Sequence, residues 1–226
     1  KITENSFKLG PSKLEWNGKK LVLEFSEITI PHFDKIEGCI TVTPESVNDL
    51  EVLLKPDGTH IWRPFSPISR IEVKTNKKGW SWQGNAYLDG NFGTRALEQD
   101  FNYWTWSRLP FKDKCLTFYD ADLVDGSTTN IALRFNKNGS VEEIEAPPLQ
   151  PISKTKWLIK RVARSDREFS PYQSKALLDA PFYSRSEIVT QIDREKSTGV
   201  HETLDMRRFT NPFIKPLLCA KIPRIF

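Results

Sequence analysis

A carboxyl group among aromatic residues is the feature of this sequence best suited to chemistry. Asp89 follows Tyr87 by two residues, and Trp80 and Trp82 lie just before them. In a β-strand, residues two apart share a face, so the tyrosine and the acid would lie together, as would the two tryptophans. A carboxyl in an apolar cavity is desolvated, and desolvation keeps it protonated. This spacing therefore favours a neutral acid that can donate a proton.

Two further segments repeat this spacing. His60 and Trp62 would share one strand face, and Trp104 and Trp106 would share another. An ordinary structural interpretation stays open beside the catalytic one. In it, Asp89 begins a hairpin turn, the tryptophans are core residues, and His60 is a buried structural histidine. Without further information, the residues alone favour the structural interpretation.

Short strands joined by tight turns are expected to position these side chains. Alternating apolar residues predict half-buried strands over 21–25, 131–135 and 140–144, and the best helix candidate is one or two turns over 44–50. Turn signals recur between the apolar segments. They are Asn17-Gly18, Asp57-Gly58, Asp125-Gly126 and Asn138-Gly139.

Many antiparallel strands with regular turns predict an all-β protein, either a barrel or a sandwich. A closed barrel is attractive because it leaves no exposed edge and can hold one small ligand. Prolines at 147, 148 and 151 either divide the chain into two sheet-forming halves or mark a long crossing loop.

The composition excludes several classes of protein. The 226 residues carry 33 Lys+Arg and 29 Asp+Glu, a net charge of +4 that argues weakly against nucleic acid as a partner. No apolar stretch approaches the roughly 18 residues that a membrane-spanning helix needs. The three histidines lack metal-ligand spacing, and the three widely spaced cysteines favour a reducing compartment. No phosphate-binding loop, dinucleotide fingerprint or nucleophile elbow is present, so the expected function is cofactor-free chemistry or binding.

Ordered landmarks run along nearly the whole chain. They are Phe7-Lys8-Leu9-Gly10-Pro11-Ser12, His60-x-Trp62-Arg63-Pro64, Trp82-x-Gly84-x-x-Tyr87-x-Asp89-x-Asn91-x-Gly93, Leu97-Glu98, Phe101-x-x-Trp104-x-Trp106-Ser107-Arg108, Asp179-x-Pro181-Phe182-Tyr183-x-Arg185-Ser186, His201-Glu202, Arg208-Phe209-x-x-Pro212 and Ile222-Pro223-Arg224. In these residues the sequence resembles the carotenoid 1,2-hydratases, also called hydroxyneurosporene synthases. It departs from the family at Phe92, where a tryptophan is commoner, and before Lys1, where the family has a further aromatic-rich segment.

The resemblance implies an all-β, lipocalin-like β-barrel architecture in two domains. Residues 1–79 would be the remainder of a first domain that is incomplete at its N-terminus, and residues 80–226 would form the second. It also implies a cofactor-independent hydro-lyase that adds water to the terminal 1,2 double bond of an acyclic carotenoid such as neurosporene or lycopene. The product would be a tertiary alcohol.

Carried over residue by residue, the resemblance places the catalytic residues at His60, Trp62, Tyr87 and Asp89. Asp89 would donate the proton, oriented by Tyr87, while Trp62 would stabilise the cation and His60 would hold the attacking water. Trp62, Tyr87 and Asp89 are therefore expected to line one cavity. The expected substrate-binding residues are Trp82, Trp104, Trp106 and Phe92, and the rival acids are Glu98, Glu202 and Asp205.

The substrate class also predicts a membrane partner, because a long hydrocarbon must be drawn from a bilayer. The segment 213–226 mixes apolar and basic residues, which suits peripheral contact with an anionic lipid surface, although it could equally dock as a final strand. The resemblance places the protein in bacteria, on the cytoplasmic side of the membrane. Two rival functions stay open: a carotenoid or prenyl-lipid carrier without turnover, and a cyclase of prenyl substrates.

Overall fold

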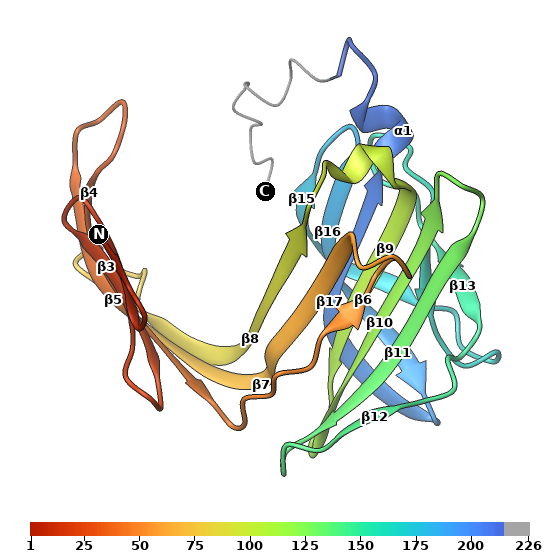
Figure 1. The fold of residues 1–226 in the computed structure, drawn as a ribbon, viewed down its shortest axis with the longest axis horizontal. Helices are drawn as coiled ribbons and strands as arrows, with labels where there is room; N and C mark the ends of the chain where they lie inside the picture. The colour runs from red at the N-terminus through yellow and green to blue at the C-terminus, as the bar shows by residue number, and fades with distance from the viewer. Residues whose placement is uncertain (215–226) are drawn as a thin grey trace. The chain divides into compact units, whose positions relative to one another are not determined.

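The structure is a computed structural model that describes residues 1–214 (Figure 1). Strands make up almost all of its regular structure, and the helical elements in this range are the one-turn segments η1 (Leu97–Gln99) and α1 (Met206–Phe209). The prediction of an all-β fold built from antiparallel strands is confirmed. The short helix predicted over 44–50 is wrong, because strand β5 pairs with β7 through Pro44 and Glu45 continues the pairing with a hydrogen bond to Ile68.

One sheet is built mainly from successive hairpins, in the order β1-β2-β3-β4-β5-β7-β6, with β8 also paired to β7. Its strands are β1 (Ile2–Thr3), β2 (Ser6–Leu9), β3 (Ser12–Trp16), β4 (Leu21–Ile28), β5 (Lys35–Pro44), β6 (Val52–Leu53), β7 (His60–Thr75) and β8 (Trp82–Gly93).

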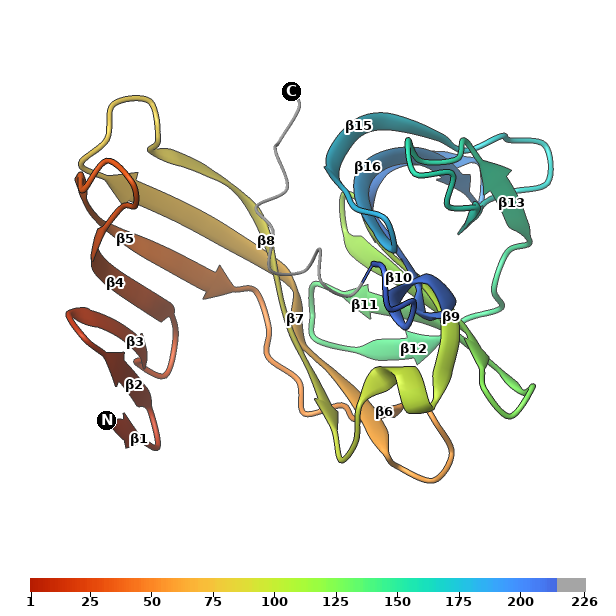
Figure 2. The same ribbon diagram turned by 90° about the horizontal axis from the view of Figure 1, so that it is seen from above.

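A second sheet has seven strands in the order β12-β11-β10-β9-β17-β16-β15, and every neighbouring pair is antiparallel. Its strands are β9 (Phe101–Pro110), β10 (Lys114–Leu123), β11 (Thr128–Asn136), β12 (Val141–Glu143), β15 (Tyr172–Asp179), β16 (Tyr183–Ile192) and β17 (Glu195–Asp205). The pairing found within residues 1–214 leaves β12 and β15 as its edges, so this sheet is open rather than a closed barrel. Figure 2 shows that it is strongly curved.

All four predicted turns join neighbouring strands. Asn17-Gly18 lies between β3 and β4, Asp57-Gly58 between β6 and β7, Asp125-Gly126 between β10 and β11, and Asn138-Gly139 between β11 and β12. The turns need glycine for a backbone reason: φ is +87° at Gly18 and +86° at Gly126, a region that other residues rarely adopt.

The proline-rich segment is a crossing connection within one sheet. It follows β12 and contains β13 (Leu149–Ile152), which pairs with β14 (Arg161–Arg164) before the chain returns to the seven-stranded sheet at β15. Of the two predicted alternatives, the long crossing loop is therefore the one observed.

The chain forms two compact units. Unit 1 comprises residues 1–50, 63–90 and 137–139, and unit 2 comprises residues 51–62, 91–136 and 140–226. A buried apolar cluster of unit 2 comprises Leu109, Leu116, Phe118, Ala132 and Ile192. The predicted domain boundary between residues 79 and 80 falls inside unit 1, and the division into two lipocalin-like domains stays a prediction.

Candidate active site

Asp89 lies at an apolar pocket of unit 1. The pocket has a volume of about 310 Å³, and its lining includes Trp16, Leu21, Phe65 and Leu88 together with the acid. Asp89 itself is exposed and lies within β8, so the alternative that it begins a hairpin turn is wrong. The fold thus brings a solvent-accessible carboxyl against a wall of apolar side chains.

Two other predicted site residues belong to the same unit and the same strand. Tyr87 is half-buried, two residues before Asp89 on β8. Trp82, at the beginning of β8, is 54% exposed, and its ring lies over Gly84, where an added Cβ would be 3.5 Å from the indole. Trp82 therefore offers an aromatic surface to solvent.

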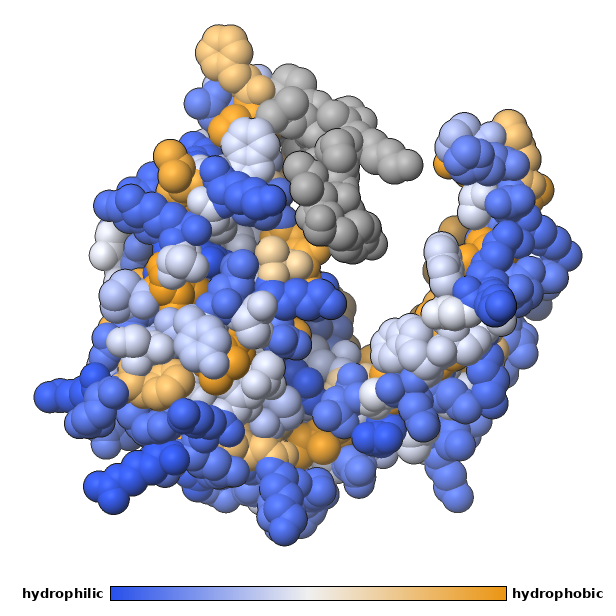
Figure 3. Space-filling model, turned by 180° about the vertical axis from the view of Figure 1, so that it is seen from behind, coloured by the Kyte–Doolittle hydropathy of each residue, from blue (hydrophilic) through white to orange (hydrophobic). Residues whose placement is uncertain are grey.

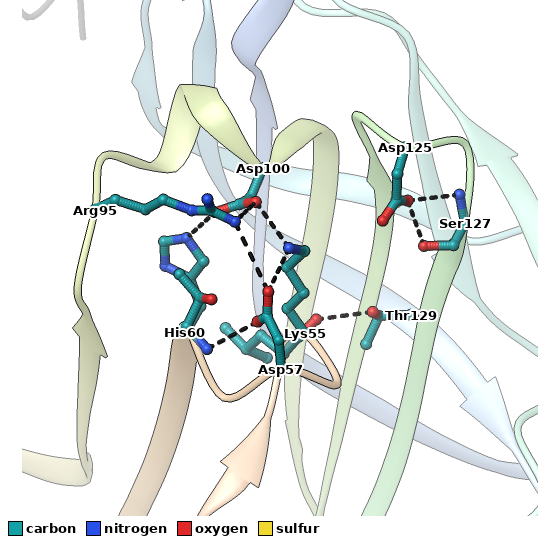
Figure 4. A network of polar contacts seen from close by, with 10 residues as sticks. Lys55, Asp57, His60, Arg95, Asp100, Asp125, Ser127 and Thr129 are labelled. Carbon is teal, nitrogen blue, oxygen red and sulfur yellow. Dashed lines mark hydrogen bonds and ion pairs between the residues drawn. The ribbon is translucent and has the colours of Figure 1, made fainter.

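His60 belongs to unit 2, where it lies within a cluster of charged residues (Figure 4). Its side chain is almost fully buried, and Nε2 lies 2.8 Å from Oδ2 of Asp100, which is also buried. Arg95 donates two hydrogen bonds of 2.6 Å to the Asp100 carboxylate, and Nζ of Lys55 lies 3.2 Å from it. Lys55 also pairs with Asp57, at 2.6 Å.

Local backbone structure places this cluster. The Asp57 carboxylate accepts the backbone N–H of Thr59 at 2.9 Å, which closes the turn that leads into His60. Asp100 follows η1, and its own N–H donates to the carbonyl of Leu97. Burial raises the pKa of Asp100, but hydrogen bonds from Arg95, His60 and Lys55 outweigh burial and hold that pKa below its usual value. Asp100 is therefore a carboxylate at neutral pH.

Aromatic rings pack together in unit 2 as well. Trp62 is 1% exposed, and its ring centroid lies 6.2 Å from that of Tyr119. Trp104 also stacks on Tyr119, with a centroid distance of 5.6 Å. Trp106 is buried, whereas Phe92 is half exposed. For the two tryptophans of β9, these contacts are those of core packing.

The face of β9 opposite Trp104 and Trp106 carries Tyr103 and Thr105. A cavity of about 690 Å³ in unit 2 is lined by Tyr103 and Thr105 of this strand and by charged residues that include Asp120, Lys160 and Asp205. Of the residues considered in the sequence analysis, the rival acid Asp205 is among those lining this cavity. The alternation of β9 thus places Trp104 and Trp106 on the face away from this cavity.

The structure distributes the predicted site residues over both units. Unit 1 holds Trp82, Tyr87 and Asp89; unit 2 holds His60, Trp62, Phe92, Trp104 and Trp106. That Trp62, Tyr87 and Asp89 line one cavity stays a prediction. The sequence reasoning missed Asp100 and Tyr119, although Asp100 follows the Leu97-Glu98 landmark by only two residues.

Two of the rival acids have cationic partners. Oε1 of Glu202 lies 3.0 Å from Nε of Arg185, and Oδ2 of Asp205 lies 3.4 Å from Nε of Arg208. Both carboxyls are thus engaged in ion pairs in the structure. Glu98 lies half-buried in η1.

His201, next to Glu202, is a fully buried histidine of unit 2. Its Nε2 lies 2.8 Å from the carbonyl oxygen of Val162 and 3.3 Å from Oγ1 of Thr105. The carbonyl can only accept, so Nε2 carries the proton. Burial lowers the pKa of His201 to about 4. The residue is a neutral structural histidine at physiological pH.

Residues 1–214 contain no group of three or more His, Cys, Asp or Glu side chains arranged to hold a metal ion. The helices in this range are too short and too polar to pass through a lipid bilayer.

A family model described as carotenoid hydratase CrtC matches residues 1–226. The chain belongs to the carotenoid hydratase family. It is 46% identical over 224 residues to an acyclic carotenoid 1,2-hydratase of Rhodobacter capsulatus, covering 98% of this chain and 79% of that protein. A protein of the same name from Cereibacter sphaeroides is 43% identical, covering 96% of this chain and 77% of the relative. The resemblance found in the sequence is confirmed, and with it the expectation of a family of hydro-lyases.

Solved structures support the fold. A Nitrosomonas europaea protein assigned to AttH superposes with a TM-score of 0.57 at 12% identity, covering 89% of this chain and 70% of that one. Kievitone hydratase from Nectria haematococca gives a TM-score of 0.54 at 11% identity, covering 88% and 69%. At such identities the likeness concerns the fold alone.

The burial of His201 leads to a prediction about acid stability. The folded-state pKa lies below the unfolded value of about 6.5, so the unfolded chain binds more protons between these two values. The free energy of unfolding should therefore fall by roughly 1–2 kcal/mol from this group as the pH drops from 7 to 5. In urea titrations, His201→Gln should lose this part of the pH dependence, whereas a variant of the exposed His32, His32→Gln, should retain it. Equal pH dependence in all three proteins would contradict the assignment.

Proposed function

We propose that this protein adds water to the terminal 1,2 double bond of an acyclic carotenoid of the neurosporene or lycopene type. The observation that carries the proposal is the 46% and 43% identity, over nearly the whole chain, to proteins named acyclic carotenoid 1,2-hydratase. The all-β fold and the acid at an apolar pocket agree with it.

The proposed reaction is a cofactor-independent hydration. A proton added to C2 of the trisubstituted alkene leaves the positive charge on the tertiary carbon C1. Water then forms a bond to C1 and gives up a proton to the base, so the product is a tertiary alcohol. Release of that proton to solvent and uptake of a proton from solvent by the carboxylate restore the base and the acid. Each step needs one group from the protein: a neutral acid, an aromatic face for the cation, and a base for the water.

Asp89 is the proposed acid. It is the carboxyl among the residues that line the apolar pocket of unit 1, which include Leu88, Trp16 and Phe65. A hydrocarbon in this pocket would displace water from the carboxyl, and desolvation favours the protonated form. Tyr87, on the same strand, is proposed to orient it.

The remaining roles rest on the family motif. Trp62 is proposed to stabilise the cation, since an aromatic face near a carbocation contributes about 0.5–2 kcal/mol, and more where water is excluded. His60 is proposed to take the proton of the attacking water. Trp82 and Phe92 are more than half exposed, which suits contact with a long polyene.

The two rival functions, a cyclase and a carotenoid carrier, would each give a different outcome. Incubation with lycopene followed by mass spectrometry distinguishes them: a gain of one water supports hydration, and a pigment of unchanged mass but altered absorption supports a cyclase. Pigment that is retained by the protein and recovered unaltered supports a carrier. Absence of any hydrated product from the folded protein would overturn the proposal.

Asp89→Asn tests the proton donor. The substitution keeps the size of the side chain but removes its acidity, so hydration should fall by about 10²–10⁴-fold, the usual contribution of general acid catalysis. The readout is product formed per folded protein, with folding checked by circular dichroism. Glu202→Gln, which removes an acid already paired with Arg185, should retain far more activity. Near-normal hydration by Asp89→Asn would exclude Asp89 as the donor.

We also propose peripheral contact with the membrane that holds the substrate. The segment 213–226 was the sequence-based candidate for this contact, and most of it, 215–226, lies outside the described residues. Within unit 1, the loops after β4 and after β7 expose Ile30, Phe33 and Trp80 at 81%, 74% and 60%. The amide of Asn76 donates to the carbonyl of Lys35 at 3.3 Å, which holds the two loops together. Figure 3 shows apolar residues at the surface among hydrophilic ones.

Flotation with anionic liposomes measures this contact. The protein should float with the vesicles, and replacing Ile30 and Phe33 by serine should reduce the floating fraction several-fold, because apolar side chains at a bilayer contribute by their buried area. A second variant truncated after residue 214 reports the share of the C-terminal segment. Complete recovery of the parent protein in the aqueous fraction would remove membrane contact from the proposal.

A further inference from the structure

The charge state of Asp100 determines which ring nitrogen of His60 carries a proton. Asp100 accepts two hydrogen bonds from Arg95 and has Lys55 at 3.2 Å, and these cations keep the pKa of its carboxyl low despite burial. A carboxylate has no proton to donate. The 2.8 Å contact between Oδ2 of Asp100 and Nε2 of His60 is therefore a hydrogen bond in which Nε2–H is the donor.

The other ring nitrogen is consequently an acceptor whenever His60 is neutral. In a neutral imidazole one nitrogen is a donor and the other presents a lone pair. With Nε2 bonded to Asp100, the lone pair of His60 is on Nδ1. The ring cannot easily exchange its two nitrogens by rotation, because it is almost fully buried and packs edge-on against Phe101, at a centroid distance of 5.0 Å.

Gly93 is the residue next to the Nδ1 edge. It ends β8, and a Cβ added there would lie 2.7 Å from Nδ1 and 3.1 Å from Cε1 of His60. The backbone of Gly93 is not in the left-handed region, so the conformation alone does not demand glycine. Glycine is needed because a Cβ would collide with the imidazole ring of His60. Gly93 is also exposed, so its missing side chain leaves the lone-pair edge of His60 next to the protein surface.

We propose that Asp100 is a positioning residue that fixes His60 as the Nε2–H tautomer, and that Nδ1, beneath Gly93, is the atom that accepts the proton of the attacking water. The assignment of the basic atom deepens the proposed hydration and rests on it. The tautomer assignment does not rest on the proposed hydration. In this arrangement Lys55 and Arg95 act indirectly, since they keep Asp100 ionised and so keep Nε2 occupied.

Nitrogen-15 NMR of the imidazole rings tests the tautomer without any substrate. The chain has only three histidines, so the His60 signals can be assigned by their loss in His60→Gln. At mildly alkaline pH, His60 should show a protonated Nε2 and an unprotonated Nδ1. Asp100→Asn should convert this pattern to a mixture of tautomers, because the asparagine amide can either donate or accept. An Nδ1–H tautomer in the parent protein would overturn the proposal.

Asp120→Asn is the matched control. Asp120 is also buried and also pairs with an arginine, Arg164, in the same unit. Its replacement removes a comparable buried charge pair but should leave the His60 tautomer unchanged. Hydration by folded Asp100→Asn should fall at least about tenfold in kcat with a smaller change in KM, part of the roughly 10²–10⁴-fold that general base catalysis supplies. An equal effect of both variants on kcat and on the tautomer would mean that Asp100 has only a structural role.

The variant Gly93→Ala tests whether Nδ1 of His60 is the basic atom. This test can be made even if Asp100→Asn does not fold. The new methyl group would cover Nδ1, so hydration should fall at least about tenfold while Nε2 stays protonated. Gly84→Ala is its control on the same strand, because a Cβ there meets its nearest atom at an ordinary 3.5 Å. Full activity of Gly93→Ala with an unshifted His60 signal would exclude Nδ1. Failure of the parent protein to hydrate any carotenoid would instead overturn the proposed function and leave the tautomer result standing.

Discussion

The antiparallel ladder on both sides of β9 is the constraint on which unit 2 depends. β9 pairs with β10 on one side and with β17 on the other, which fixes its register at Trp106↔Tyr119 and Trp106↔Glu202. Because side chains alternate along a strand, this register places the tryptophans on one face and Tyr103 and Thr105 on the other. Aromatic packing around Tyr119 and the polar cavity are therefore two consequences of the same ladder. Asp100 directly precedes β9, so the ladder also sets the position of the partner of His60.

Two buried carboxylates of unit 2 have cationic partners, which compensate for their desolvation. Asp100 is held by Arg95 and Lys55, and Asp120 by Arg164. The pairing also has a chemical consequence, because an ionised Asp100 can only accept hydrogen bonds. A charge network that stabilises the fold thus determines the proton distribution on His60.

The sequence predicts local structure well where the pattern that determines this structure lies within one short segment. Period-two alternation and Asn-Gly or Asp-Gly turns predicted strands and hairpins that the structure contains. The prediction of a helix over 44–50 is wrong. It rests on a local signal, a proline after a capping residue, whereas in the structure Pro44 pairs with β7. Asp100 could not be recognised as the partner of His60, because 40 residues separate them and only the tertiary fold joins them. Asp89 was identified by its spacing and motif, whereas its apolar neighbours Trp16 and Phe65 come from distant strands.

The central claim is that the reaction begins with a proton from the protein and ends with capture of water. Hydration of lycopene in D₂O enriched in ¹⁸O water tests both halves in one product. Rapid exchange loads the donor carboxyl with deuterium, so the account predicts one deuterium at C2 and one ¹⁸O at C1 for each double bond hydrated. A product without deuterium at C2, or with its hydroxyl oxygen from a source other than water, would contradict it.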